Sequence, residues 1–391
     1  MRRLSLGAAA FLVVVLAPIV EPAAAESVAK GPFEPGSDWE IVAPGDVGMD
    51  SYTLNWSRVY AFQEGRNTQG VVVVRHGAIA AEWYAPGRGQ DSWGASWSMA
   101  KSFTSALIGI AIEDGLIPSV DEPMATYYPE WAGTPRDAIT LRHVLQQASG
   151  LHWNEEYDPE AGPIEESEII QLVLFHPDEL AYVSDLQYES EPGTVFNYSS
   201  GNTLLLSGVI EHATGMSVAE YAQQELFGPI GIDQVEWWQD AAGHTLTYCC
   251  LDMPSRDFAR MGLLFLNDGM WGDEPVVPAQ WVLDSTTPSP AFDGYGYQWW
   301  LEGNMNDRLP DDTYAAEGHD GQFIYVIPSL DLVVVRNGIY DKFDGPGVAE
   351  PNLYGKYPSD SRGDHLGTML SEIGWDDAAF LLPIIESIQD V

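Results

Sequence analysis

The sequence predicts an α+β fold, in which one antiparallel sheet is built from both ends of the chain, helices flank the sheet, and a mainly helical domain is inserted. Three observations support this prediction. Strand-like runs occur at residues 70–84 and again at residues 321–336. The residues between them are rich in turns and short amphipathic patterns. A helical pattern over residues 375–388 lies close to the end of the sequence.

These changes in composition set the expected domain limits. Residues 26–117 and 291–391 are expected to form the sheet domain, and residues 118–290 the helical domain. Residues 1–25 have the pattern of a secretory signal peptide, with two arginines, an apolar run and three alanines before the expected cleavage site. We therefore predict a secreted protein, periplasmic or extracellular, with no stable membrane insertion after cleavage. An uncleaved membrane anchor is the alternative interpretation.

The first hairpin follows a short helix expected around residues 54–63. Residues 70–75 include four consecutive valines, the pattern of a buried strand. A turn at His76 and Gly77 leads into a second strand over residues 78–84.

Short amphipathic patterns predict the helices of the inserted domain. They cover residues 141–148, 167–175, 201–213 and 218–226. The second hairpin follows, with strands at residues 321–327 and 332–336 joined by a turn.

The stretch from Trp97 to Ala111 carries the main candidates for chemistry. Apolar residues after Ser98 fall at helical spacing, and Gly115 is a typical helix stop. Ser98 and Lys101 should therefore share one face of the first turn. The N–H groups and helix dipole there favour an oxyanion, so Ser98 can attack a carbonyl. Lys101 can accept the serine proton if burial lowers its pKa.

A chance pair on an exposed helix is the alternative interpretation of this short spacing. A second match, Ser27 to Lys30, lies in a stretch with Gly and Pro and is not followed by an apolar helix, so we discount it. Lysine is rare in this chain, at positions 30, 101, 342 and 356 only. A lysine on the inner turn of an apolar helix is therefore unlike a residue kept for solubility.

Two further stretches contain groups that an acyl-transfer site needs. Tyr198 and Ser200 stand at the start of the helix expected at residues 201–213. A phenol held beside a lysine ammonium loses its proton more easily and can serve as base and acid. Packing is the alternative role for such a tyrosine.

The second stretch runs from Glu317 to Gln322 and leads into a strand. Its two glycines, one of them Gly321, permit a close approach of the backbone to a ligand. The backbone N–H of Gln322 is a candidate oxyanion donor. A plain turn with a hydrogen-bonded His319 is the alternative.

Taken in order, Ser98-x-x-Lys101, Tyr198-x-Ser200 and His319-x-Gly321 resemble the motifs of the serine β-lactamase and penicillin-binding-protein superfamily. From about residue 40 onward the chain is similar to the class C branch, and most of all to its 6-aminohexanoate-dimer hydrolase and esterase members. Further stretches that carry the resemblance are residues 145–151, 198–202 and 295–300.

The resemblance implies a β-lactamase-like fold and a role for each motif residue. Ser98 would be the acylated nucleophile, and Lys101 and Tyr198 would share the acid and base steps. Ser200 would orient Lys101. The backbone N–H groups of Ser98 and Gln322 would form the oxyanion hole.

Two departures from the family pattern bear on the substrate. His319 stands where β-lactamases usually have the lysine of Lys-Thr-Gly, and Ser200 stands where class C enzymes usually have Asn. Both differences favour esters or linear amides over lactams. Tyr157 lies where amide-hydrolysing relatives carry a substrate-facing tyrosine, although an exposed loop tyrosine is the alternative.

We therefore predict an exported serine hydrolase that cleaves ester or linear amide bonds through an acyl-enzyme on Ser98. A β-lactamase or D-alanyl-D-alanine carboxypeptidase is the alternative within the superfamily. A non-catalytic protein that binds peptidoglycan fragments is the alternative of another class.

Charge and composition limit the partners. The net charge of −41 repels nucleic acids and anionic membranes, so we expect neither as a partner. The resemblance implies a small-molecule ester or amide as the partner, and the oligomeric state is open. The sequence has no Cys/His cluster with metal-ligand spacing and no phosphate-cradling loop, so we expect no metal and no cofactor. The two cysteines, Cys249 and Cys250, are adjacent, either as a disulfide or as two buried thiols.

Overall fold

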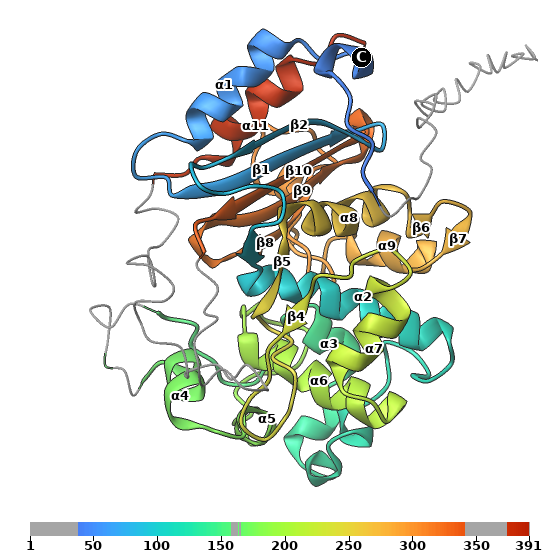
Figure 1. The fold of residues 1–391 in the computed structure, drawn as a ribbon. Helices are drawn as coiled ribbons and strands as arrows, with labels where there is room; N and C mark the ends of the chain where they lie inside the picture. Colours follow the sequence, from blue (N-terminus) through green and yellow to red (C-terminus); the bar gives the residue numbers. More distant parts are fainter. Residues whose placement is uncertain (1–37, 158–162, 164–165, 341–373, 391) are drawn as a thin grey trace, which may run out of the picture.

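The computed structural model describes residues 38–157, 163, 166–340 and 374–390 (Figure 1). The signal peptide predicted for residues 1–25 lies outside these residues. A five-stranded antiparallel sheet, with the strand order β2-β1-β10-β9-β8, forms one half of the fold. The strands are β1 (Thr68–Arg75), β2 (Ala78–Tyr84), β8 (Tyr314–Gly318), β9 (Gln322–Ile327) and β10 (Leu332–Gly338).

The middle of this sheet joins the two ends of the chain. Strand β1 pairs with β10, so that Val72 lies opposite Val335 and Arg75 lies opposite Leu332. Each of these two strands also forms a hairpin with its neighbour in sequence, β2 or β9. The predicted α+β fold with a sheet built from both ends is thus confirmed.

Helices cover both faces of the sheet (Figure 1). Helices α1 (Ser51–Ala61) and α11 (Asp377–Glu386) pack on one face, and α8 (Ser255–Leu266) packs on the other. Alternate residues of a strand point to opposite faces, so Val71 and Val73 join the core under α1 whereas Val72 and Val74 join the core under α8. Burial on both faces explains the continuous valine run. The domain limits at residues 117 and 290 remain predictions.

The second half of the fold is built around α2 (Ala100–Glu113), which is buried from Ala100 to Ala111. A helix that is apolar on all sides is a core helix. The approach of α9 is so close that a side chain at Gly109 would collide with Trp281. The remaining helices are α3 (Leu141–Leu145), α4 (Glu168–Phe175), α5 (Glu179–Ser184), α6 (Ser200–Thr214), α7 (Val218–Ala222), α9 (Ala279–Ser285) and α10 (Glu302–Met305).

Short strands connect the two halves. Strand β3 (Trp93–Ala95), directly before the nucleophile segment, pairs with β5 (Leu251–Pro254), which also pairs with β4 (Glu236–Trp237). Strands β6 (Met270–Trp271) and β7 (Glu274–Pro275) form a separate hairpin. Within the described ranges, no helix has the length and apolar character needed to cross a membrane.

Candidate active site

Ser98 lies in a tight turn at the start of the central helix. The turn is a short 3-10 helix, η2 (Trp97–Met99), and α2 begins at Ala100. Ser98 therefore precedes the first α-helical turn instead of lying in it as predicted. Trp97 has a φ of 45°, which is an outlier for a bulky side chain and marks a backbone held in place by its surroundings.

Lys101 is the centre of the site. Its side chain is 1% exposed, and Nζ donates to Ser98 Oγ at 2.9 Å, to Ser200 Oγ at 3.1 Å and to the carbonyl oxygen of Tyr248 at 3.0 Å. Burial lowers the pKa of Lys101 to about 8, against an opposing contribution from the carboxylate of Glu155. An amine with this pKa is partly neutral near pH 7 and can take a proton from Ser98.

Tyr198 is the second polar side chain, after Lys101, that hydrogen-bonds to Ser98. Its hydroxyl hydrogen-bonds to Ser98, its ring centre lies 5.0 Å from Lys101 Nζ, and the ring stacks on Trp300. Desolvation, helped by Tyr295 and the carboxylate of Glu155, raises the pKa of Tyr198 well above its ordinary value. The role of Tyr198 as a base beside the Lys101 ammonium stays a prediction. Tyr198 keeps its proton at neutral pH and is suited to donate it.

Ser200, the first residue of α6, bridges Lys101 to a carboxylate. Its hydroxyl accepts from Lys101 and donates to Glu155 Oε1 at 2.5 Å. This contact is what the orienting role predicted for Ser200 requires. Glu155 itself was not predicted, because a glutamate in a loop has no motif spacing to distinguish it.

Tyr157 faces the site and is partly buried. Its hydroxyl donates to Glu155 Oε1 at 2.6 Å, and its ring meets the ring of His319 edge-on with centroids 5.2 Å apart. Tyr157 is therefore not the exposed loop tyrosine of the alternative interpretation. The predicted contact with substrate stays a prediction.

The turn after β8 comes up against the nucleophile segment. A Cβ atom at Gly318 would lie 2.2 Å from the carbonyl oxygen of Ser96, so this approach requires glycine. Gly321, with a φ of 76°, then directs the chain into β9. The side chain of Gln322 accepts from Asn337 Nδ2 and from the backbone N–H of residue 338, both at 3.0 Å. The side chain of Gln322 is thus occupied in the sheet, and the oxyanion role of its backbone N–H stays a prediction.

His319 stands on this turn between two aromatic rings, Trp97 and Tyr157. Its Nδ1 lies 2.9 Å from Asp320 Oδ1. Its Nε2 atom is buried and has no hydrogen-bond partner among the described residues. A buried polar atom of this kind requires an explanation, and the substrate-binding role of His319 stays a prediction.

Arg336 of β10 supports this turn through hydrogen bonds to its carbonyl oxygens, and it was not predicted either. Its Nη1 atom donates to the carbonyl oxygens of Asp320 and Gly321, both at 2.6 Å, and its other nitrogens bond to Thr68 Oγ1 and the carbonyl of Arg66. Burial lowers the pKa of Arg336 to about 10. The guanidinium is therefore still charged at neutral pH.

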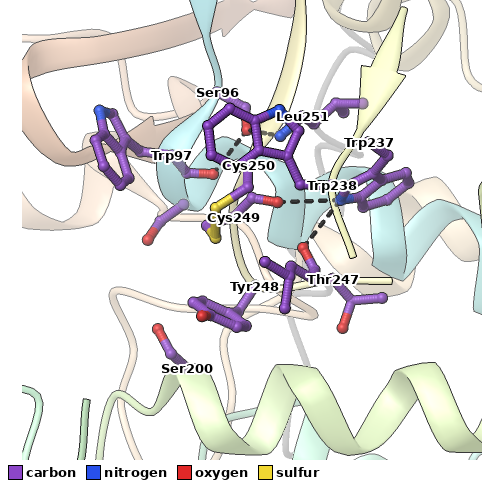
Figure 2. Close-up of a disulfide and its surroundings, with 12 residues drawn as sticks. Ser96, Trp97, Ser200, Trp237, Trp238, Thr247, Tyr248, Cys249, Cys250 and Leu251 are labelled. Atoms are coloured by element: carbon purple, nitrogen blue, oxygen red, sulfur yellow. Dashed lines mark hydrogen bonds between the residues drawn. A yellow bond between two sulfur atoms is a disulfide. The ribbon is translucent and has the colours of Figure 1, made fainter. Parts of the chain in front are cut away.

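The two cysteines lie next to the site and form a disulfide (Figure 2). They directly follow Tyr248, whose carbonyl oxygen binds Lys101. After them, Leu251 donates its N–H to Ser96 Oγ at 3.0 Å and accepts from the Ser96 N–H at 2.8 Å. The segment 248–251 thus contacts both Lys101 and the turn that carries the nucleophile.

A surface hollow of about 770 Å³ is not part of this site. It lies at the far end of α2 and is lined by residues that include Ile110, Glu113, Asp114 and Trp271. In the part of the chain that the structure describes, no group of three His, Cys, Asp or Glu side chains is arranged to hold a metal ion.

The model of one protein family, described as Beta-lactamase, matches residues 57–337. This match covers every site residue described above. The chain belongs to the beta-lactamase family. The members of this family are serine hydrolases, and so is this chain.

One curated relative and two solved structures illustrate what this chain is similar to. A 6-aminohexanoate-dimer hydrolase from Paenarthrobacter ureafaciens is 25% identical over 288 residues, which span 69% of this chain and 72% of the relative. The structure of a Bacillus anthracis protein, provisionally named a 6-aminohexanoate-dimer hydrolase, aligns with a TM-score of 0.62 at 23% identity over 72% of this chain and 76% of its own. A family VIII carboxylesterase aligns with a TM-score of 0.58 at 15% identity over 79% of this chain and 96% of its own. The two structures show a shared fold, which confirms the predicted β-lactamase-like architecture.

Proposed function

We propose that this chain is an exported serine hydrolase that cleaves ester or linear amide bonds through an acyl-enzyme on Ser98. The observation that carries the proposal is the 2.9 Å contact between Ser98 Oγ and the buried Lys101 Nζ. The amine is close enough to take the serine proton, and its lowered pKa of about 8 makes it a base near neutral pH.

The first half of the reaction uses three side chains. Neutral Lys101 accepts the proton of Ser98 as Oγ attacks the substrate carbonyl carbon. The negative charge that develops on the carbonyl oxygen is stabilised by the backbone N–H groups of Ser98 and Gln322. Protonated Tyr198 gives its proton to the leaving alcohol or amine, and the ammonium of Lys101 restores the Tyr198 proton.

The second half releases the acid. Water attacks the ester formed on Ser98 and gives one proton to Lys101. The bond between the acyl carbon and Ser98 Oγ breaks, and Ser98 recovers its proton from the Lys101 ammonium. The enzyme returns to its starting state without a cofactor in the cycle.

The surroundings of His319 support esters and linear amides over lactams that carry a carboxylate. A lysine at this position would supply a fixed charge for such a carboxylate, whereas His319 is paired with Asp320. The nearby guanidinium of Arg336 is held by backbone carbonyls beneath the turn. The names of the relatives agree with this choice, since they include a 6-aminohexanoate-dimer hydrolase and a carboxylesterase.

Export is supported by the signal pattern of residues 1–25 and by the disulfide between Cys249 and Cys250. Disulfides persist in oxidising compartments and are rare in the cytosol.

The direct test is the intact mass of residues 26–391 after mixing with p-nitrophenyl acetate, for the wild type and for Ser98→Ala. We expect a transient acetyl adduct on the wild type only. An adduct of equal yield on Ser98→Ala would contradict the assignment of the nucleophile. No adduct on either protein would favour the non-catalytic binding protein.

The substrate class is tested by comparing kcat/KM for p-nitrophenyl acetate, the 6-aminohexanoate dimer and a cephalosporin. We expect the ester or the linear amide to exceed the cephalosporin. The opposite order would favour a β-lactamase.

A further inference from the structure

We propose that Glu155 is a positioning residue, whose carboxylate fixes the direction of the hydrogen-bond chain from Ser200 through Lys101 to Ser98. In this role it turns the lone pair of neutral Lys101 toward the nucleophile. The inference rests on the proposed function, in which Lys101 is the base. Glu155 acts through Ser200 and is not placed against the substrate.

The contacts of Glu155 all require it to accept hydrogen bonds. Its Oε2 accepts from the backbone N–H of Ser200 at 2.9 Å and from the indole N–H of Trp153. Its Oε1 accepts from Ser200 Oγ at 2.5 Å and from the hydroxyl of Tyr157 at 2.6 Å. A carboxylate has acceptor sites for four donors and has no proton to give, so it matches this set of donors.

The direction of the next bond follows from this arrangement. The hydroxyl of Ser200 has one proton, and that proton is committed to Glu155. The oxygen of Ser200 therefore presents a lone pair to Lys101 Nζ, 3.1 Å away. The other fixed neighbour of Nζ is the carbonyl oxygen of Tyr248 at 3.0 Å, which can only accept.

These two acceptors use both N–H bonds of a neutral lysine amine. The third position, from which the ammonium form donates to Ser98 Oγ at 2.9 Å, holds the lone pair once Lys101 is neutral. The lone pair of Lys101 therefore faces the proton that it must remove. The direction of every bond in this chain depends on a group at position 155 that accepts and does not donate.

A glutamine at position 155 loses this property. Its amide can donate to Ser200 Oγ, which frees the Ser200 proton to turn toward Lys101 and compete for the lone pair. The substitution also removes a negative charge that favours the ammonium form of Lys101. Since the charged form is then less favoured, Lys101 loses its proton at lower pH, and the acid limb of the pH profile should move to lower pH.

The neighbouring Glu156 provides a matched control. Glu156→Gln removes the same charge one position along the loop. The backbone of Glu156 bonds to the side chains of Asn154 and Ser167, outside the chain of bonds that ends at Ser98.

The test is the acylation rate with p-nitrophenyl acetate, followed from pH 5 to pH 10 as the burst of released nitrophenol. For Glu155→Gln we expect a rate lower by about 10- to 100-fold and an acid limb shifted down by about 0.5 to 1 pH unit. For Glu156→Gln we expect a rate within about twofold of wild type and a smaller shift, since Glu155 is the carboxylate that contributes to the pKa of Lys101.

A double-mutant cycle with Ser200→Ala separates the effect of Glu155 on hydrogen-bond direction from its effect on packing. If Glu155 acts through the hydroxyl of Ser200, Glu155→Gln should cost little further rate once that hydroxyl is absent. A structural role would be different, because the contacts of Glu155 with Trp153, Tyr157 and the backbone of residue 200 persist in Ser200→Ala. The same fold-loss in both backgrounds would overturn the inference.

Other outcomes also decide the matter. A wild-type acylation rate and pH profile for Glu155→Gln would overturn the role of Glu155 while the acyl adduct of the wild type upholds the proposed function. No wild-type adduct would overturn both. If Glu155→Gln does not fold, Ser200→Ala alone decides: a loss of about tenfold or more supports the chain of bonds, and a wild-type rate overturns it.

Discussion

Lys101 and Arg336 are both fully buried cations, yet the fold uses them in different ways. Lys101 is surrounded by two hydroxyls and one carbonyl, and burial lowers its pKa to about 8. Arg336 lies mainly among backbone carbonyls, and its pKa of about 10 leaves it charged. Burial lowers the pKa of an amine far enough for it to act as a base near neutral pH. A guanidinium that is equally buried stays charged and holds backbone carbonyls by hydrogen bonds.

The largest expected effect comes from removing the base. We expect Lys101→Met to lower kcat/KM for p-nitrophenyl acetate by about 10⁴-fold, as when one member of a catalytic unit is lost. Lys101→Arg should be comparably inactive, because a guanidinium does not give up its proton at neutral pH. Circular dichroism provides the folding control. A loss below about tenfold for Lys101→Met would contradict its role as base.

The next effect is on stability, at the other cation. Arg336→Met removes the donor from the carbonyl oxygens of Asp320, Gly321 and Arg66, which are buried or partly buried, and each unsatisfied group costs about 1 to 3 kcal/mol. We expect the free energy of unfolding in urea to fall by about 4 kcal/mol. Arg336→Lys should recover little, since an ammonium cannot match the planar fork. An unchanged midpoint would show that the guanidinium does not support the turn.

Replacing Lys101 should raise the stability of the fold, whereas replacing Arg336 should lower it. Its pKa is lowered from 10.5 to about 8, so its favourable contribution is present above pH 10.5 and is lost as the pH falls through 8. At pH 7 the loss of stability caused by burying the charged Lys101 is roughly 3 kcal/mol, and the hydrogen bonds of Lys101 partly offset it. We therefore expect Lys101→Met to unfold at a higher temperature than wild type at pH 7, with the gap closing toward pH 10. A lower unfolding temperature at pH 7 would contradict this sign.

The smallest effect belongs to a cation at the surface. Arg142 forms an ion pair with Asp121 at 2.7 Å, and both side chains are exposed. We expect Asp121→Asn to change the free energy of unfolding by less than about 1 kcal/mol, because exposed pairs gain little in water. Raising the salt concentration should reduce the difference further. A larger loss in urea unfolding would show that exposed and buried cations contribute alike.

Much of this arrangement could be predicted from the sequence, because it depends on short-range periodicity. The apolar runs of β1 and β10 indicate strands that are buried on both faces, and the sheet is built from them. The distance between Ser98 and Lys101 follows from their spacing along one short segment. Tyr198 and Gln322 could be placed through the order of the motifs.

The remainder depends on where loops fold in space. Glu155 reaches Ser200 only because its loop returns to the start of α6, and nothing in its local sequence signals this. The carbonyl oxygen of Tyr248 has no side-chain signature at all. Arg336 stands near the end of an apolar strand, where a charged residue usually indicates solvent, yet it lies beneath a turn.

The pairing of β1 with β10 also determines when the molecule can be completed. Thr68 is opposite Gly338, so the hairpin of β1 and β2 cannot pair with β10 until almost the whole described chain has been synthesised. Contacts of this range make folding slow, because a long loop must close before they form. For a polypeptide that crosses a membrane unfolded, this delay is an advantage. In the export that we propose, the sheet therefore stays incomplete on the ribosome side until β10 has been synthesised.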